Sequence, residues 1–277
     1  LGGPGGLSTT HDRHLLCPEP YATYFAQAVT SAGDLNGDGY GDIAVSGRGA
    51  NNVRDRVFVY HGGPSGVPAT PTLIFARPGN TVEQGNDDSG FGMSLANAGD
   101  FNGDGFADLV VGAPRISRIG NEAIGGAFLF YGSTSGLDLT AGATTSMDAP
   151  GTRTTFGVSV AGVGDYNGDG LADVLVGERG LPPSATGLGH LYYGRQAFAP
   201  SLFSPVLLGV AGSGLSVHRV FGPGDLNSDG LADAVVLFNG PVTVFHGRTD
   251  APPFPAVVPR TSFVTQPSRA YTAAGAL

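Results

Sequence analysis

Hydrophobic residues along this chain occur in short runs that are separated by polar segments rich in glycine and aspartate. One kind of run is β-branched and directly follows an aspartate-rich segment, as in Ile43–Val45 and Leu109–Val111. Another is aromatic and ends close to a glycine, as in Val57–Tyr60 and Phe128–Tyr131. No segment shows the 3.6-residue periodicity of a helix. The pattern therefore predicts short β-strands that are joined by turns.

These runs recur in a fixed order, and the order occurs four times. A short apolar segment precedes each aspartate-rich loop: Phe25–Thr30, Phe91–Leu95, Phe156–Val160 and the weaker Ser216–Val220. The β-branched run follows the loop, and the other two are Val174–Val176 and Ala234–Val236. The aromatic strand comes next, with Leu191–Tyr193 and Val242–Phe245 as the later copies, and then a variable fourth segment such as Thr72–Phe75 or Pro205–Leu208. Four short strands of this kind predict an antiparallel meander, and radial repetition of such sheets gives the blades of a β-propeller.

The loops share one nine-residue pattern with oxygen-bearing side chains at positions 1, 3, 5 and 9 and glycine at position 6. Their first aspartates are separated by 66, 65 and 60 residues, a period that indicates a repeat architecture. Oxygen ligands at this spacing suit calcium, which takes six to eight of them. The predicted ligands are the four side chains and the position-7 carbonyl. They are Asp34, Asn36, Asp38, Tyr40 and Asp42; Asp100, Asn102, Asp104, Phe106 and Asp108; Asp165, Asn167, Asp169, Leu171 and Asp173; and Asp225, Asn227, Asp229, Leu231 and Asp233.

The aspartate pattern also permits two other interpretations. An EF-hand loop carries a bidentate glutamate at position 12, whereas these loops have valine there and continue into a β-branched run. Four aspartate turns without metal are the second alternative. Magnesium fits less well because it demands octahedral geometry and retains its waters. We therefore expect about four structural Ca²⁺ ions, one in each loop between two strands.

The units resemble FG-GAP repeats, the blades of the integrin α-subunit β-propeller. The second unit matches best, because Phe91-Gly92 opens it and Gly112-Ala113-Pro114 closes its second strand. The third keeps Phe156-Gly157, and the fourth keeps only the metal loop. The resemblance covers roughly residues 20 to 250. It implies calcium-stabilised blades in an extracellular or cell-surface protein.

The expected architecture is one all-β propeller domain over residues 1–277, with four complete repeats and a partial blade at each end. The repeats are placed at about residues 21–85, 86–150, 151–213 and 214–262. Residues 1–20 are assigned to the outer strand of one partial blade, and residues 263–277 to the first strand of another. The sequence leaves open whether these partial blades continue a longer array or join to close a smaller ring.

Composition and charge narrow the possible functions. The formal net charge is −9, but twelve of the 23 acidic residues lie in the loops, so four divalent ions would bring it to −1. All 14 basic residues are arginine, and they form no stripe that could neutralise a nucleic-acid backbone. Cys17 is the only cysteine, so no disulfide can form within the chain. No apolar run is long enough to insert into a membrane.

We find no catalytic constellation, so the sequence predicts a non-enzymatic protein. Binding is expected in the long loops at the blade ends opposite the calcium loops, over residues 47–55, 78–89, 113–125 and 178–188. Candidate partner-binding residues in these loops are Arg48, Arg54, Arg115, Arg118 and Arg179. The preferred function is an extracellular adhesion module for a protein or matrix partner. A lectin-like module that binds glycans and a structural display array are the alternatives, and open blade edges could support an oligomer or a longer array.

Overall fold

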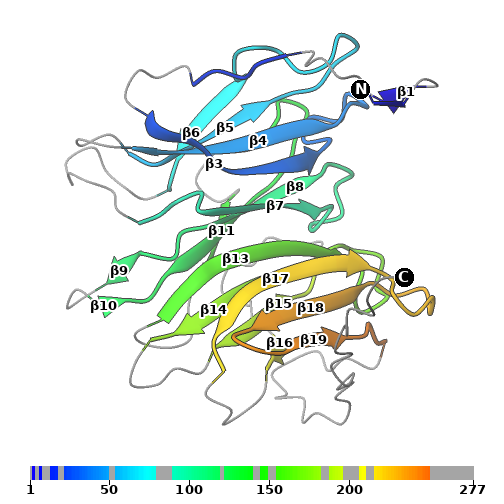
Figure 1. The fold of residues 1–277 in the computed structure, drawn as a ribbon. Coiled ribbons are helices and arrows are strands. Elements are labelled where there is room, and N and C mark those ends of the chain that lie inside the picture. The colour runs from blue at the N-terminus through cyan, green and yellow to red at the C-terminus, as the bar shows by residue number, and fades with distance from the viewer. Residues whose placement is uncertain are drawn as a thin grey trace, which may run out of the picture.

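The structure, a computed structural model, describes residues 2–3, 6–7, 13–17, 22–49, 54–78, 89–118, 122–139, 144–148, 154–181, 187–195, 206–209 and 215–249. Every regular element within these residues is a β-strand, which confirms the predicted all-β class (Figure 1). The same residues contain no helix with the length and hydropathy needed to cross a bilayer.

Three four-stranded antiparallel meanders and one three-stranded meander follow one another along the chain. Sheet 1 contains β3 (Ala22–Gly33), β4 (Asp42–Gly49), β5 (Arg56–Tyr60) and β6 (Leu73–Ala76). Sheet 2 contains β7 (Ser94–Gly99), β8 (Asp108–Gly112), β11 (Gly126–Phe130) and β12 (Thr144–Asp148). Sheet 3 contains β13 (Thr154–Gly164), β14 (Asp173–Gly180), β15 (Leu188–Tyr192) and β16 (Val206–Leu208). Sheet 4 contains β17 (Val217–Gly224), β18 (Asp233–Phe238) and β19 (Val242–Phe245).

Two small hairpins accompany the sheets. β1 (Gly2–Gly3) pairs with β2 (Gly6–Leu7), and β9 (Ser117–Arg118) pairs with β10 (Glu122–Ala123). The second hairpin lies in the segment 113–125, which the sequence pattern placed in an irregular loop. This segment is therefore partly ordered as β-structure.

The first strand of each sheet differs from its predicted extent. In all four sheets it continues to the glycine that precedes the loop: Gly33, Gly99, Gly164 and Gly224. Each of these glycines has a positive φ, between 69° and 83°, so the strand can turn sharply into the loop. Phe91, expected in a strand, instead precedes β7 and packs in the core. The hydrophobic pattern predicted only the buried part of these strands. It did not predict the polar residues that continue each strand to the loop.

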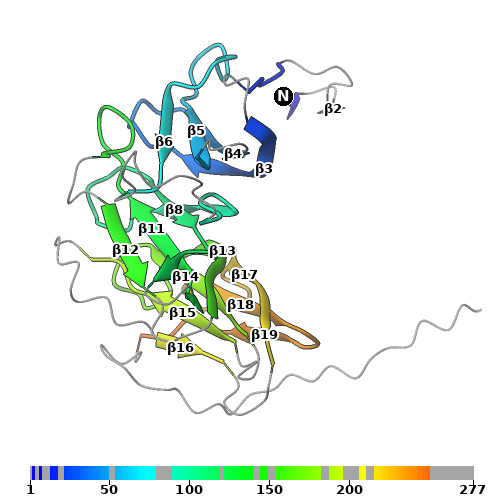
Figure 2. The same ribbon diagram turned by 90° about the vertical axis from the view of Figure 1, so that its left-hand side faces the viewer.

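The four complete repeats of the prediction are reduced to three four-stranded sheets and one three-stranded sheet in the described residues. A fourth strand after β19, and the partial blade at residues 263–277, lie outside the described residues. The described sheets follow one another as propeller-type repeats and do not close a ring (Figure 2).

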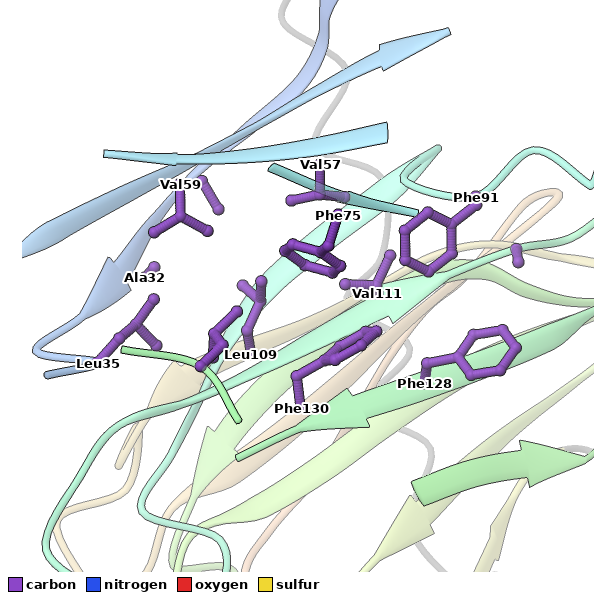
Figure 3. Packing of buried hydrophobic residues seen from close by; sticks show 13 residues of the cluster. Ala32, Leu35, Val57, Val59, Phe75, Phe91, Leu109, Val111, Phe128 and Phe130 are labelled. Carbon is purple, nitrogen blue, oxygen red and sulfur yellow. The ribbon is translucent and has the colours of Figure 1, made fainter. Parts of the chain in front are cut away.

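The core lies between consecutive sheets. Between sheets 1 and 2, Val57, Val59 and Phe75 pack against Leu109 and Phe130 (Figure 3). The rings of Phe75 and Phe130 have centroids 4.7 Å apart. Similar clusters join sheet 2 to sheet 3 and sheet 3 to sheet 4. Each sheet thus has two apolar faces, which explains why its central strands read as continuous hydrophobic runs rather than as an alternating pattern.

The first strands of successive sheets contact one another, in the order β3, β7, β13 and β17. A groove of about 860 Å³ runs along them, and all four strands contribute to its lining. Polar side chains such as Gln27 and Asn97 share this lining with Val160 and Phe221. This groove occupies the place of the axial channel of a propeller.

Replacement of Leu129 in β11 by alanine is expected to lower the free energy of unfolding by about 2–5 kcal/mol, because a fully buried leucine leaves a cavity. The matched control is Val244→Ala in β19. Strand register makes Val244 the counterpart of Leu129, but its side chain is 40% exposed. We expect that control to cost less than about 0.5 kcal/mol. Urea unfolding measures both variants, and equal losses would contradict the assignment of the core.

Candidate metal centre

All four aspartate loops connect the first strand of a sheet to its second strand, as the sequence predicts. They therefore lie at one end of the sheets. The glycine at position 6 has a φ of 86°, 91°, 88° and 90° in the four loops, which an L side chain rarely adopts. The fourth loop has Ser228 at position 4, where the others have glycine, and Ser228 keeps a left-handed φ of 60°.

Side-chain oxygens at positions 1, 3 and 5 fold each loop around backbone N–H groups. In the first loop, the amide of Asp38 donates to Oδ1 of Asp34 and to Oδ1 of Asn36, both at 3.1 Å. Oδ2 of Asp34 accepts from the amide of Gly39 at 2.8 Å, and Oδ1 of Asp38 accepts from the amide of Tyr40 at 2.9 Å. The other three loops repeat these contacts within a few tenths of an ångström.

The aspartate at position 9 has a different environment. Asp42, Asp108, Asp173 and Asp233 begin the second strands and are at most 1% exposed. One carboxylate oxygen of Asp108 accepts from the amide of Phe101 in its own loop, and the other accepts from the amide of Gly132 after the third strand, both at 2.9 Å. The other three aspartates accept the same pair of bonds: Asp42 from the amides of Leu35 and Gly62, Asp173 from those of Tyr166 and Gly194, and Asp233 from those of Leu226 and Gly247. This carboxylate therefore ties the loop to the end of the third strand.

The first three loops also bond to the following sheet. The carbonyls at positions 1 and 2 of the first loop, Asp34 and Leu35, accept from the amides of Ala107 and Ser133 in sheet 2. The second loop bonds in the same way to Ala172 and Arg195, and the third to Ala232 and Arg248. Ala107, Ala172 and Ala232 each occupy position 8 of the next loop. The loops are thus linked in series, from one sheet to the next.

Burial determines the electrostatics of position 9. It raises the pKa of Asp108 and of Asp173 from 3.8 to about 7, against the lowering effect of their backbone hydrogen bonds, and the loop carboxylates at positions 5 and 1 add repulsion. The pKa of Asp42 is also raised, mainly by burial. At the exposed position 5, hydrogen bonds from Asn36 and Tyr40 instead lower the pKa of Asp38. A cation would favour the ionised form of every one of these groups.

The donor set of each loop fits a hard cation. It consists of carboxylate, amide and carbonyl oxygens, and two of them already lie close together because they accept from the same position-5 amide. Within the described residues, no three Asp, Glu, His or Cys side chains form a metal cluster by themselves. A site in these loops would therefore also need the asparagine at position 3 and backbone oxygens. The position-9 oxygens retain acceptor capacity beside their N–H partners.

The five candidate arginines lie at the ends of the sheets opposite the loops, but not all of them lie in loops. Arg48 and Arg179 belong to the last residues of β4 and β14, and Arg118 belongs to β9. Nε of Arg179 donates to the carbonyl of Val217 at 3.3 Å. Arg54 precedes β5. Arg115 follows β8 and is exposed. The prediction of four irregular loops was wrong for the strand extensions at Arg48 and Arg179.

Sequence reasoning did not single out the buried pair of Glu178 and His190. Oε2 of Glu178 lies 2.5 Å from Nε2 of His190, and the histidine ring packs edge-on against Phe156. Both residues are at most 6% exposed. Alternation along β14 and β15 places them on a packed face, a position that no local sequence signal marks. Their burial leaves no open face for a substrate.

The FG-GAP repeat profile matches residues 25–60, 91–121 and 156–193, which contain the first three loops and their second strands. These segments are FG-GAP repeats. The matches end before sheet 4, which nevertheless has the same loop bonds and the same strand register as the FG-GAP repeats before it.

Integrin alpha-5 of Xenopus laevis is 33% identical to this chain over 204 residues, which is 68% of the chain and 18% of that protein. Integrin alpha-3 of Cricetulus griseus is 33% identical over 168 residues, or 56% of the chain and 14% of that protein. Phosphatidylinositol-glycan-specific phospholipase D of Bos taurus is 32% identical over 168 residues, or 59% of the chain and 19% of that protein. The chain spans less than a fifth of the length of these relatives.

In the absence of divalent cations, the melting temperature is expected to fall as the pH rises from 5 to 8. Because the pKa of Asp108 and Asp173 is raised from 3.8 to about 7 on folding, the folded chain binds more protons than the unfolded chain between these values. Raising the pH through 7 therefore removes stability. Differential scanning fluorimetry in EDTA measures this slope. A melting temperature that rises across the same interval would contradict the assignment.

Proposed function

We propose that this chain is a calcium-stabilised, non-catalytic binding module of an extracellular or cell-surface protein. It recognises a protein or matrix partner through the end of the sheets opposite the aspartate loops. The observation that best supports this proposal is the separation of charge. Twelve loop carboxylates lie at one end of the sheets, and the candidate arginines lie at the other. The similarity to integrin alpha subunits favours an adhesion or binding module of the FG-GAP type.

Calcium has a structural role in this proposal. Each loop would hold one ion through its side chains at positions 1, 3, 5 and 9 and its position-7 carbonyl. The ion would neutralise carboxylates that burial and mutual repulsion keep from ionising freely. It would also stiffen the residues that carry the hydrogen bonds to the next sheet. Binding at one loop would thereby stabilise two sheets.

Chelation of divalent ions is expected to lower the melting temperature markedly. Extracellular calcium modules bind with dissociation constants of roughly 10⁻⁴–10⁻³ M. A free calcium concentration tenfold above such a constant contributes about 1.4 kcal/mol per site, or about 5–6 kcal/mol for four sites. The measurement compares melting curves in 5 mM calcium and in EDTA, with removal of the metal verified by elemental analysis. Identical curves after verified removal would refute the structural role.

The end opposite the loops suits recognition for two reasons. It is formed by strand ends and connections on a rigid set of sheets, where sequence can vary without loss of the core. Among the side chains that the structure describes at this end, the carboxylates of Asp55 and Glu178 are 2% and 6% exposed, whereas Arg115 is exposed. The charge that this end presents among the described side chains is therefore mainly positive. An acidic partner surface would complement it.

Binding to an array of purified extracellular-matrix proteins in 1 mM calcium tests the proposal. Arg115→Glu should weaken any signal by at least tenfold, because it reverses a charge on the proposed binding end. The matched control is Arg195→Glu, at the loop end, which should retain the signal if its melting temperature is unchanged. A parallel glycan array tests the lectin-like alternative. Glycan signal without protein signal would replace the proposal by that alternative, and no signal on either array would favour a structural display array.

A further inference from the structure

Asparagine directly precedes glycine at four places in this chain, and three of these places are positions 3 and 4 of the aspartate loops. The pairs are Asn36-Gly37, Asn102-Gly103, Asn167-Gly168 and Asn239-Gly240. Asparagine is a chemically labile residue, and a following glycine favours loss of its side-chain amide, because glycine has no Cβ to shield its backbone nitrogen and restricts the backbone least. The fourth loop has Ser228 after its asparagine and lacks this combination. The four pairs share one chemistry, so their surroundings decide which of them reacts.

The backbone amide after the asparagine is the reacting group, and the second and third loops hold it in a hydrogen bond. The amide of Gly103 donates to Oδ1 of Asp100 at 2.7 Å. The amide of Gly168 donates to Oδ1 of Asp165 at 2.6 Å. Each bond joins an N–H group to a carboxylate, so it is stronger than a bond between neutral groups. The nitrogen must break this bond before it can attack the neighbouring side chain.

The pair outside the loops is held in a similar way. The amide of Gly240 donates to the carbonyl of Phe238 at 2.7 Å. Oδ1 of Asn239 accepts from the amide of Ser216 at 2.9 Å, which fixes the side chain as well. Both reacting groups of this pair are therefore engaged with other partners.

The first loop departs from this arrangement at a single bond. Oδ1 of Asp34 accepts from the amide of Asp38 at 3.1 Å and Oδ2 accepts from the amide of Gly39 at 2.8 Å, as in the other loops. The amide of Gly37, however, donates to no acceptor among the described residues. Gly37 is exposed, and so are the position-4 glycines of the next two loops. Access to water therefore does not distinguish the three loops, whereas the hydrogen bond does.

We propose that Asn36 is a site of spontaneous modification, at which water converts the asparagine into an aspartyl residue. The nitrogen of Gly37 attacks Cγ of Asn36 and closes a cyclic imide. The Cγ–Nδ2 bond breaks, and ammonia leaves with the proton of the Gly37 amide. Water then opens the imide: cleavage at the side-chain carbonyl gives aspartate, and cleavage at the backbone carbonyl gives isoaspartate, in which the chain runs through Cγ. This reaction does not depend on the proposed role of calcium.

Both products change the first loop. Nδ2 of Asn36 donates to Oδ2 of Asp38 at 2.9 Å, and either product replaces this donor by a carboxylate that repels Asp38. Isoaspartate also adds a carbon to the main chain before Gly37. The ring of Phe106 from the second loop packs on Gly37, since a Cβ added there would lie 2.6 Å from the ring. Isoaspartate at this position would therefore disturb the contact between sheets 1 and 2.

Site-resolved mass spectrometry of peptides from the full chain tests the proposal. The chain is aged at 37 °C in 1 mM calcium, and a melting curve verifies that it is folded. Asn36 should be converted at least about tenfold faster than Asn102 and Asn167, because the amide after each of these two must first leave a carboxylate. The variant Asn36→Asp supplies a chromatographic standard that separates aspartate from isoaspartate. Equal rates at the three asparagines in the folded chain would overturn the proposal.

The unfolded chain provides the first control. In guanidinium, all three loop asparagines keep the same following glycine but lose their folded surroundings, so their rates should converge. If Asn36 kept its full advantage there, the flanking sequence would explain the rate and the proposal would fail.

A matched variant tests the hydrogen bond itself. Asp100→Ala removes the acceptor of the Gly103 amide, so the rate at Asn102 should rise towards that of Asn36. The rate at Asn167, whose loop is unaltered, should stay low and thereby verify that the third loop remains folded. An unchanged rate at Asn102 in this variant would contradict the proposal.

Discussion

The pair of backbone hydrogen bonds to the position-9 aspartate is the interaction on which the other features of each sheet depend. A buried carboxylate is costly, and each charge-assisted bond offsets part of that cost with about 1.5–3 kcal/mol. In Asp173, one oxygen holds Tyr166 in the loop and the other holds Gly194 after the third strand. Three consecutive strands therefore share one anchor. Removal of this anchor would leave two buried N–H groups without an acceptor.

The residue at position 2 of the loop both anchors its own sheet and contacts the next sheet. The amide of Phe101 donates to Asp108 within sheet 2, while the carbonyl of Phe101 accepts from Arg195 in sheet 3. Its ring is buried at that joint. Loop conformation and the packing between sheets are therefore coupled. A cation that stiffens a loop would act on the stack of sheets as well as on one turn, which is the physical basis for assigning it a structural role.

The loops and the second and third strands could be predicted from sequence because their signals are local. The spacing of Asp100, Asn102 and Asp104 marks a turn that binds its own backbone, and Leu109–Val111 marks a strand that is buried on both faces. The pair of hydrogen bonds that Asp108 accepts could not be predicted as readily, because its second donor, Gly132, lies 24 residues away. The glycine after each aromatic strand was the one local sequence signal for this second hydrogen bond. The burial of Glu178 and His190 depends wholly on packing between sheets, so no local sequence signal indicates it.

The placement of the anchors also explains why recognition can reside at the other end. The loop ends of the first three sheets are constrained by hydrogen bonds within each sheet and to the next, so substitutions there disturb two sheets together. The opposite end is joined mainly by connections of variable length. It holds strand extensions such as those at Arg48 and Arg179 and the hairpin that contains Arg118. A binding surface can change in that region while the anchored end preserves the spacing of the sheets. The division of the molecule into an acidic, hydrogen-bonded end and an end with connections of differing length therefore follows from where the buried aspartates lie.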